Sequence, residues 1–319
     1  MKILVTGCAG FIGANFCEYI LDNYPSDVVI GVDCISYAAN IDALEGLKNR
    51  ENFRFYKENI CDVYAIDMIF SAEKPDVVIN FAAESHVDNS ISDASVFVKT
   101  NVLGTQVLLD ASMKYGVGRF HQVSTDEVYG DLHIGSDKSF DENAMLNPSS
   151  PYSASKAAAD LLAMSYMRTH GLPVSISRSS NNYGKYQHTE KLIPMTIKRI
   201  LSGEPVPLYG DGSNVRDWLY VMDNCSAIDT IVRKGKCEIY NIGADNPISN
   251  IELVKKIMTH LGMPNGEITF VEDRKGHDKM YSINSAKIRD LGWCCVADFD
   301  TELRDTVEWY KARVKKEID

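Results

Sequence analysis

The sequence lacks the runs of lysine and arginine that nucleic-acid-binding proteins carry. Its 33 basic side chains are outnumbered by 44 acidic ones, which gives a formal net charge of −11 at pH 7. An acidic chain without a basic tract repels a phosphate backbone, so we expect no nucleic-acid partner. Hydrophobic residues make up 45% of the chain, which is enough for a folded core and excludes a disordered protein.

Long apolar runs are also missing. No stretch approaches the roughly 20 residues that a membrane helix needs. The apolar run at residues 3–5 is far shorter than the core of a secretion signal. We therefore expect no membrane partner and predict a cytoplasmic protein.

The eight cysteines and seven histidines show no pattern typical of a metal site or a disulfide framework. No two cysteines form a Cys-x-x-Cys pair, and most of them lie inside apolar segments. This usage is typical of reduced thiols in a reducing compartment. The sequence thus predicts no metal site.

The first 180 residues alternate between short apolar runs and longer segments with helical spacing. Short runs that end at glycine or polar residues predict buried strands, and apolar residues three or four apart predict helices. The expected strands are 2–6, 28–33, 54–57, 76–83, 119–124 and 173–178, and the expected helices are 11–23, 63–72, 95–115 and 152–170. This alternation implies parallel strands with right-handed crossovers, and so an α/β protein with a doubly wound Rossmann sheet.

The alternation becomes less regular after residue 180. Helices are expected at 190–202, 250–261 and 301–315, and two short strands lie within 206–221. We predict a Rossmann domain at 1–180, with crossovers to a smaller C-terminal substrate lobe at 181–319. That lobe should lie over the carboxyl edge of the sheet, where open α/β sheets bind ligands.

Three glycines separate the first expected strand from the first expected helix. Gly7, Gly10 and Gly13 leave backbone N–H groups free to approach a pyrophosphate at a helix N-terminus, although the glycines alone also fit a plain turn. Asp33 ends the second strand, 20 residues after Gly13. A carboxylate there accepts ribose hydroxyls and repels a 2′-phosphate, and no arginine follows it, so the pattern favours NAD over NADP.

Tyr152 and Lys156 begin a predicted helix and, being four residues apart, share one of its faces. A nearby ammonium favours the phenolate, which can take a proton from a hydroxyl while a hydride leaves the same carbon. Such a pair is common and mostly structural when it stands alone. Downstream of a dinucleotide-binding loop, it indicates redox chemistry.

Thr125, Asp126 and Glu127 follow a predicted strand, at the edge of the sheet where ligands bind. Two adjacent carboxylates beside an apolar strand are costly to ionise together, so one of them can be held protonated. The pair can therefore supply one acid and one base. Alternatively, the two carboxylates are simply solvated at the end of the strand and have no catalytic role.

In combination, these motifs resemble the extended short-chain dehydrogenase/reductase family, over nearly the whole chain. Within it, residues 125–127 resemble the dTDP-glucose 4,6-dehydratases, whereas sugar-nucleotide 4-epimerases usually lack the Asp-Glu pair. Further matching segments are 81–88, 124–130, 180–184, 190–194, 216–221, 240–243 and 273–278. The resemblance implies a homodimer joined through the helices at 95–115 and 152–170, unless their apolar stripes face only their own sheet.

The resemblance also implies roles for individual residues. Residues expected at the NAD cofactor are Gly7, Gly10, Phe11, Ile12, Gly13, Asp33, Cys34, Ile35, Ser36, Asn59, Ile60, Phe81, Ala82, Ala83, Ser85, Thr100, Tyr152, Lys156 and Asn182. Residues expected at a nucleotide-sugar substrate are Ser85, Thr125, Asn181, Lys191, Leu192, Pro207, Tyr209, Arg216, Asn250, Arg274 and His277. The expected catalytic residues are Thr125, Asp126, Glu127, Tyr152 and Lys156.

The reaction implied by the resemblance is the loss of water from dTDP-glucose to give dTDP-4-keto-6-deoxyglucose. Tyr152 takes the C4 hydroxyl proton as C4 is oxidised, and Thr125 hydrogen-bonds the C4 oxygen. Glu127 then removes the C5 proton, Asp126 protonates the departing C6 hydroxyl, and hydride returns to C6. Two alternatives stay open: a UDP-sugar dehydratase or epimerase of the same fold, and a nucleotide-sugar-binding protein without turnover.

Overall fold

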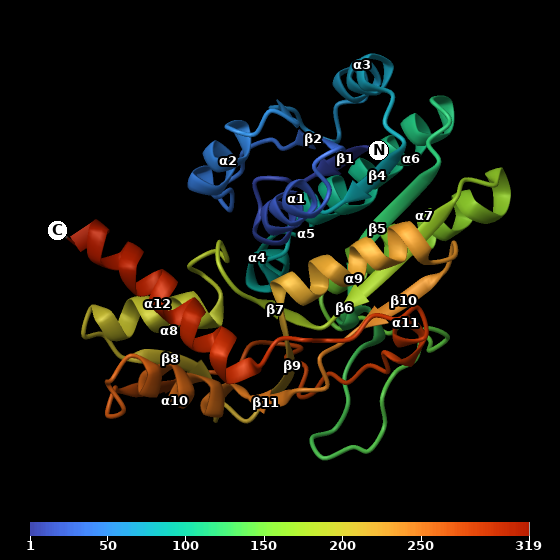
Figure 1. Ribbon diagram of the computed structural model, residues 1–319. Coiled ribbons are helices and arrows are strands. Elements are labelled where there is room, and N and C mark those ends of the chain that lie inside the picture. Colours follow the sequence, from blue (N-terminus) through green and yellow to red (C-terminus); the bar gives the residue numbers. More distant parts are fainter. Residues whose placement is uncertain (319) are drawn as a thin grey trace.

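Seven parallel strands form the central sheet, in the order β10-β6-β5-β4-β1-β2-β3 (Figure 1). The computed structural model describes residues 1–318. The strands are β1 (Lys2–Thr6), β2 (Val28–Val32), β3 (Phe53–Tyr56), β4 (Val77–Asn80), β5 (Arg119–Thr125), β6 (Val174–Ser179) and β10 (Ile239–Ile242). The strand order reverses between β1 and β4, which creates a crevice at their carboxyl ends. The predicted doubly wound sheet is confirmed.

Helices cover both faces of this sheet, because its inner strands are apolar on both sides. On β1, Ile3 and Val5 join the core on one face and Leu4 joins the core on the other. The first face is covered by α1 (Phe11–Asn23), α2 (Ile41–Lys48) and α9 (Val221–Lys234), and the second by α3 (Val63–Glu73), α6 (Gly104–Lys114) and α7 (Pro151–His170). Figure 1 shows α1 and α9 in front of the sheet.

The helix expected at 95–115 is not a regular α-helix. It consists of α5 (Ala94–Phe97), a π-helical turn η1 (Val98–Leu103) and α6, and it is preceded by α4 (Val87–Ser92). The π-helical turn carries the buried Asn101, whose Nδ2 donates to Ser155 Oγ at 2.8 Å. Asn101 Oδ1 also accepts from Glu84 N at 2.9 Å. The turn thus ties the loop after β4 to α7 beside the crevice, as π-turns at functional sites often do.

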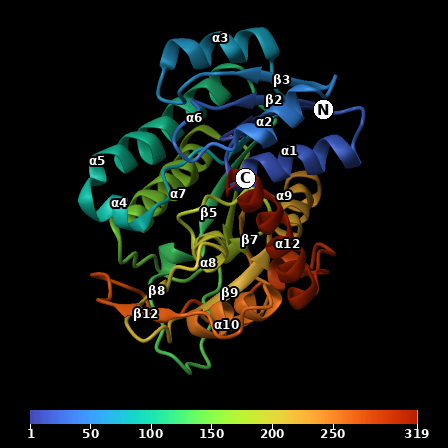
Figure 2. The same ribbon diagram turned by 90° about the vertical axis from the view of Figure 1, so that its left-hand side faces the viewer.

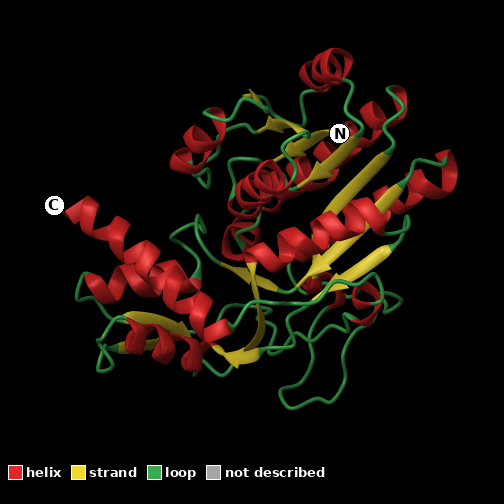
Figure 3. Cartoon of the chain, in the orientation of Figure 1, coloured by secondary structure: helices red, strands yellow, loops and turns green. Residues whose placement is uncertain are grey.

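The second lobe lies below the sheet in Figures 2 and 3 and has its own core. Its strands form two small sheets, in the orders β11-β9-β7 and β12-β8. The strands are β7 (Asn181–Tyr183), β8 (Val206–Tyr209), β9 (Val215–Tyr220), β11 (Pro247–Ser249) and β12 (Ile268–Val271). The helices are α8 (Leu192–Leu201), α10 (Asn250–His260) and α12 (Phe299–Ile318), whereas α11 (Ala286–Arg289) packs against β10 of the main sheet.

The sheet does not end at residue 180. β10 pairs with β6, and α9 packs against α1, so the predicted second lobe contributes a strand and a helix to the Rossmann sheet. The sequence predicts crossovers between the lobes, but its local patterns indicate neither β10 nor α9. Residue 319, the last of the predicted lobe, lies outside the described residues. Within residues 1–318, no helix combines the length and the apolar character that crossing a membrane requires.

A buried ion pair joins α7 to β6. Arg178 Nε donates to Asp160 Oδ2 at 3.0 Å, and the two side chains are 2% and 0% exposed. Arg178 Nη1 also donates to the hydroxyl of Tyr129 at 2.9 Å, and that hydroxyl donates to Asn241 Oδ1 on β10 at 2.8 Å. The guanidinium therefore connects α7, two strands and the turn that follows β5.

We expect Asp160→Ala to lower the free energy of unfolding by about 3–5 kcal/mol, because Arg178 would stay buried without a counter-charge. Urea denaturation of the purified protein measures the change. The matched control is Lys256→Ala, which removes a largely exposed pair with Asp300 and should have little effect. Equal urea midpoints for the two variants would contradict this prediction.

Candidate active site

The glycine loop forms one wall of a cavity at the carboxyl ends of β1, β2 and β4. Gly7 has a φ of +68°, and a Cβ there would lie 2.8 Å from Ala82 N. A Cβ on Gly13 would lie 2.2 Å from Gly7 O. Gly10 caps α1 without a side-chain hydrogen bond, so the helix presents its N-terminus to an anion. Side chains at positions 7 and 13 would force the loop apart.

Most of the residues predicted at the cofactor line this first cavity. They are Gly7, Gly10, Phe11, Ile12, Gly13, Asp33, Cys34, Ser36, Asn59, Ile60, Phe81, Ala82, Ala83, Ser85, Thr100, Tyr152 and Lys156. Ile35 and Asn182 do not line it. Ile35 packs against the core and its N–H donates to Asp33, and Asn182 lines a neighbouring cavity.

Asp33 is held in place by two backbone hydrogen bonds. Its Oδ2 accepts from Ala9 N at 2.9 Å, and its Oδ1 accepts from Ile35 N at 2.8 Å. Burial raises the pKa of Asp33, and these two N–H groups oppose the rise. No arginine lines this cavity in the described part of the chain. A fixed carboxylate beside a glycine-rich loop fits NAD, and its negative charge disfavours a cofactor with a 2′-phosphate.

A second cavity adjoins the first, between the sheet and the second lobe. The two cavities lie side by side, because four residues line both of them: Ser85, Gln187, Glu190 and Lys191. The residues predicted at the substrate that line the second cavity are Ser85, Asn181, Lys191, Leu192, Pro207, Tyr209, Arg216, Asn250, Arg274 and His277. Thr125 lines neither cavity, because it is buried at the end of β5.

The turn after β5, η2 (Asp126–Tyr129), carries both carboxylates. Thr125 caps this turn: its Oγ1 accepts from Glu127 N at 3.2 Å and donates to Asp126 Oδ1 at 3.3 Å. Glu127 faces the second cavity. Asp126 is 3% exposed, and its Oδ2 has no hydrogen-bond partner in residues 1–318. The two neighbours therefore have different surroundings.

Those surroundings set the two carboxyl groups apart electrostatically. Burial, and then the charge of Glu127, raise the pKa of Asp126 well above its usual range. Burial also raises the pKa of Glu127, but the positive charges of Arg216, Lys191 and Arg274 oppose this rise. Asp126 is consequently the group that is held protonated, and Glu127 ionises more readily.

Tyr152 and Lys156 lie on α7 and line the first cavity. A capping box between Ser150 and Ser153 fixes the start of this helix. Lys156 Nζ donates to Val123 O on β5 at 2.6 Å, and burial lowers the pKa of Lys156 to about 8. The ammonium is thus anchored to the strand that carries the carboxylates.

The structure contradicts the expectation that Lys156 favours the phenolate of Tyr152 by lowering its pKa. Burial, and then the charges of Glu127 and Asp126, raise the pKa of Tyr152 far above its usual range, and a hydrogen bond to Thr125 opposes the rise. The reason is tertiary, because the two carboxylates face a buried phenol while the ammonium is held by a strand carbonyl. Tyr152 therefore keeps its proton here.

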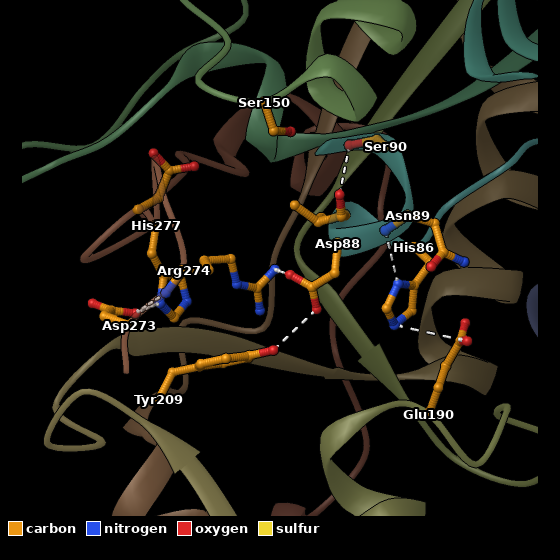
Figure 4. A network of polar contacts seen from close by, with 12 residues as sticks. His86, Asp88, Asn89, Ser90, Ser150, Glu190, Tyr209, Asp273, Arg274 and His277 are labelled. Atoms are coloured by element: carbon orange, nitrogen blue, oxygen red, sulfur yellow. Dashed lines mark hydrogen bonds and ion pairs between the residues drawn. The ribbon is translucent and has the colours of Figure 1, made fainter. Parts of the chain in front are cut away.

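Polar side chains from both lobes meet in the second cavity (Figure 4). The Tyr209 hydroxyl donates to Asp88 Oδ2 at 3.2 Å, and Arg274 Nη1 lies 3.7 Å from Asp88 Oδ1. The Arg274 guanidinium lies 5.0 Å from the Tyr209 ring centroid, and the His277 ring meets that ring edge-on. This group offers an aromatic face and a planar cation, which suit a nucleobase and phosphate oxygens.

Arg216 lies closer to the carboxylates than its expected role at the nucleotide end implies. Its guanidinium stacks over the Tyr281 ring at 4.4 Å, and its Nη2 donates to Asp278 O at 3.0 Å. Its positive charge lowers the pKa of both Asp126 and Glu127. Arg216 thus links the substrate cavity to the acid–base turn.

Several cavity residues were not identified from the sequence. Segments 81–88, 190–194 and 216–221 were matched as motifs, and they hold Asp88, Glu190 and Trp218, so a fuller use of those motifs would have found three of these residues. For the others the sequence carries no local signal, since distant segments bring them to the cavity walls. These residues are Asp88, Lys99, Gln187, Glu190, Trp218 and Tyr281.

Known proteins resemble this chain over almost its full length. The low-salt glycan biosynthesis protein Agl12 of Haloferax volcanii is 49% identical over 311 residues, which cover 97% of this chain and 98% of the relative. A dTDP-glucose 4,6-dehydratase of Haemophilus influenzae is 46% identical, with 97% and 98% covered. The crystal structure of DesIV, a dTDP-glucose 4,6-dehydratase from Streptomyces venezuelae with NAD bound, matches with a TM-score of 0.94 at 44% identity, covering 98% and 97%.

A family-level comparison agrees with these pairwise matches. The model of the family described as GDP-mannose 4,6 dehydratase matches residues 4–306. This span includes the glycine loop, the η2 turn, the Tyr152–Lys156 pair and the nucleotide end of the second cavity. The chain therefore belongs to the GDP-mannose 4,6-dehydratase family of extended short-chain dehydrogenase/reductases.

Proposed function

We propose that the chain is an NAD-dependent dTDP-glucose 4,6-dehydratase, which removes water from dTDP-glucose to give dTDP-4-keto-6-deoxyglucose. The observation that carries this proposal is the η2 turn, where Asp126 is held protonated and Glu127 is kept more readily ionised, close to Tyr152. Elimination of water needs one acid and one base, whereas 4-epimerisation needs neither at C5 and C6. The names of the relatives from Haemophilus influenzae and Streptomyces venezuelae support the same substrate.

NAD would be held in the first cavity by the residues that fit it. Phe11 and Ile12 would supply N–H groups to the pyrophosphate, Asp33 would accept from the adenosine ribose, and Tyr152 and Lys156 would hold the nicotinamide ribose. When bound, NAD supplies a hydride acceptor for C4 and a hydride donor for C6. The protein's own residues must then move the protons.

Oxidation at C4 requires a base for the C4 hydroxyl proton. Tyr152 would take it as the phenolate, after giving up its own proton to solvent, and the anchored ammonium of Lys156 on the same helix face would stabilise that phenolate. Thr125, which hydrogen-bonds within the turn, would also bond the C4 oxygen. The ketone formed at C4 makes the C5 proton acidic.

Elimination divides the work between the two carboxyl groups. Glu127, whose ionised form the charges of Arg216 and Lys191 favour against the effect of burial, would take the C5 proton. Asp126, protonated because it is buried, would give its proton to the C6 hydroxyl, which leaves as water. The C–O bond at C6 breaks as the C5–C6 double bond forms.

The second cavity would hold the nucleotide and the sugar. Tyr209, Arg274 and His277 would bind the nucleoside end, and the planar donors of Arg216 suit the diphosphate. The remaining residues proposed at the substrate are Ser85, Asn181, Lys191, Leu192, Pro207 and Asn250. Binding at this end would position the sugar ring beside the η2 turn.

We also propose a homodimer. Large apolar side chains are exposed on one group of neighbouring helices, namely Val98 and Leu103 on η1 and Leu161 on α7. Other residues of α6 and α7 face the sheet, so these helices are apolar on two sides. A second copy of the chain would cover the outward side.

Two further expectations remain proposals. We propose a cytoplasmic location, with which the eight free thiols agree. We also propose that residues 1–180 bind the cofactor and residues 181–319 bind the nucleotide sugar. The walls of the two cavities support this division, because each range lines mainly one of them.

NAD should copurify with the protein, since each turnover would regenerate it, and NADP should not replace it. Denaturing the protein and identifying the released nucleotide by chromatography tests this. Asp33→Asn, which removes the charge but keeps the shape, should admit NADP. Recovery of mainly NADP from the wild-type protein would contradict the role of Asp33.

The charge of Arg216 should appear in the pH dependence of kcat. Because Glu127 acts deprotonated, the rate falls as pH falls through its pKa. Arg216→Leu removes a charge that lowers this pKa, so the acid limb should move to higher pH, whereas Arg216→Lys should keep the wild-type limb. Arg274→Ala should mainly raise KM. An acid limb that stays in place in Arg216→Leu would exclude this electrostatic role.

Single substitutions should separate the steps of the reaction. With dTDP-glucose in D₂O, Glu127→Gln should lower kcat by ~10²–10⁴-fold, still oxidise C4, and incorporate no deuterium at C5. Asp126→Asn should also oxidise C4 but release water slowly, and Tyr152→Phe should fail before C4 oxidation. The absorbance of reduced nicotinamide and mass spectrometry of C5 measure these outcomes.

The wild-type protein, tested with dTDP-glucose and UDP-glucose in parallel, is the control for this series. It should form the 4-keto-6-deoxy sugar from dTDP-glucose at a higher kcat/KM. Rapid C5 exchange in Glu127→Gln would show that another group is the base. No product from either nucleotide sugar would refute the proposed function itself.

A further inference from the structure

Residues 184–191, between β7 and α8, form a segment of the second lobe that takes part in both cavities. Gln187, His188, Glu190 and Lys191 line the first cavity together with the glycine loop. Three of them also line the second cavity. A molecule in the first cavity would therefore lie between the Rossmann sheet and this segment.

Two side chains of α1 hold the beginning of this segment. Glu18 accepts from Lys185 Nζ with Oε2 at 2.5 Å and from the Tyr186 hydroxyl with Oε1 at 2.8 Å, so both carboxylate oxygens are used. One turn earlier on the helix, Asn15 Nδ2 donates to Lys185 O at 3.0 Å. These contacts join the second lobe to the helix whose N-terminus faces the first cavity.

The backbone of the segment needs such support. Gly184 has a φ of +145°, and a Cβ there would lie 2.6 Å from Val221 Cγ1. Tyr186 has a φ of +72°, which is uncommon for a residue with a side chain. From the opposite side, the Tyr310 hydroxyl of α12 donates to Gln187 O at 2.6 Å. The segment is thus fixed between α1 and α12.

The end of the segment also contacts the Rossmann domain. Lys191 Nζ donates to Ser85 O at 3.0 Å, and Glu190 Oε2 lies 3.7 Å from His86 Nε2 (Figure 4). The segment therefore spans the first cavity and is held at both of its ends. Glu18, Lys185 and Tyr186, which form the attachment at the beginning of the segment, line neither cavity. This attachment can therefore be altered without changing a residue that contacts a ligand.

We infer that Glu18 holds residues 184–191 closed over bound NAD and thereby sets the rate at which NAD leaves. The inference rests on the proposed function, in which the cofactor must stay bound from C4 oxidation until hydride returns to C6. NAD could leave past this segment only if the segment moved, and movement at its beginning would break the contacts with Glu18. Glu18 is a positioning residue, since it acts through Lys185 and Tyr186.

The test measures NAD release from the purified holoenzyme, with an excess of an NAD-specific dehydrogenase and its substrate to trap the released cofactor. Loss of one part-exposed ion pair and one hydrogen bond should make release from Glu18→Ala about tenfold faster. The matched control is Asp22→Ala, which removes the ion pair of Asp22 with Arg50 at 2.8 Å from the same helix. Release from the control should equal that from the wild type.

A charge exchange distinguishes the ion pair from a general effect on stability. Glu18→Lys should release NAD faster still, since two ammonium groups would face each other. Adding Lys185→Glu should slow release again, because the pair is restored in reverse and the Tyr186 oxygen can accept from the new lysine. The thermal midpoint of each variant is measured alongside.

Two results would overturn the inference. Equal release rates for wild type and Glu18→Ala, or faster release that the charge exchange fails to reverse, would show that Glu18 does not control the segment. Both results leave the proposed function intact, because the wild-type protein still carries NAD. A wild-type protein that forms no product from dTDP-glucose or UDP-glucose, even with added NAD, would instead overturn the proposed function and, with it, this inference.

Discussion

The buried guanidinium of Arg178 is the constraint on which the geometry of the site depends. It is paired with Asp160, one turn after Lys156 on α7, and it donates to Tyr129, the last residue of the η2 turn. A charge buried this deeply is costly unless its partners are in place, so α7 and η2 are held in one relative position. That position brings the Tyr152–Lys156 pair and the two carboxyl groups to the same edge of the sheet.

The second lobe does more than enclose a substrate. Arg216 on β9, Lys191 before α8 and Arg274 after β12 place positive charge near Glu127. At Asp126, burial and the charges of Glu127 and Asp217 raise the pKa, and Arg216 opposes the rise. The lobe therefore gives two adjacent carboxyl groups different electrostatic surroundings, as the proposed division into an acid and a base requires. The same lobe supplies residues 184–191, so it lines both cavities.

Local patterns were sufficient to predict most of the Rossmann sheet. β1 and α1 have the predicted bounds, and α7 differs by one residue, because strong apolar periodicity and clear end signals define them. α9 and β10 were missed, and the domain boundary was placed at residue 180 for that reason. β10 has four residues, and its assignment depends on pairing with β6, about sixty residues earlier in the chain, which no local window contains.

The sequence by itself determined the Rossmann fold, the glycine loop, the preference for NAD and the residue types of the site, because each depends on spacing along one element. The functional roles of those residues stay predictions. Only the tertiary structure decided which carboxyl group is held protonated, that Tyr152 keeps its proton, that Arg216 faces the carboxylates, and that Glu18 holds residues 184–191. These properties arise from charge and burial contributed by distant segments, and the pKa of a group depends on what surrounds it in space.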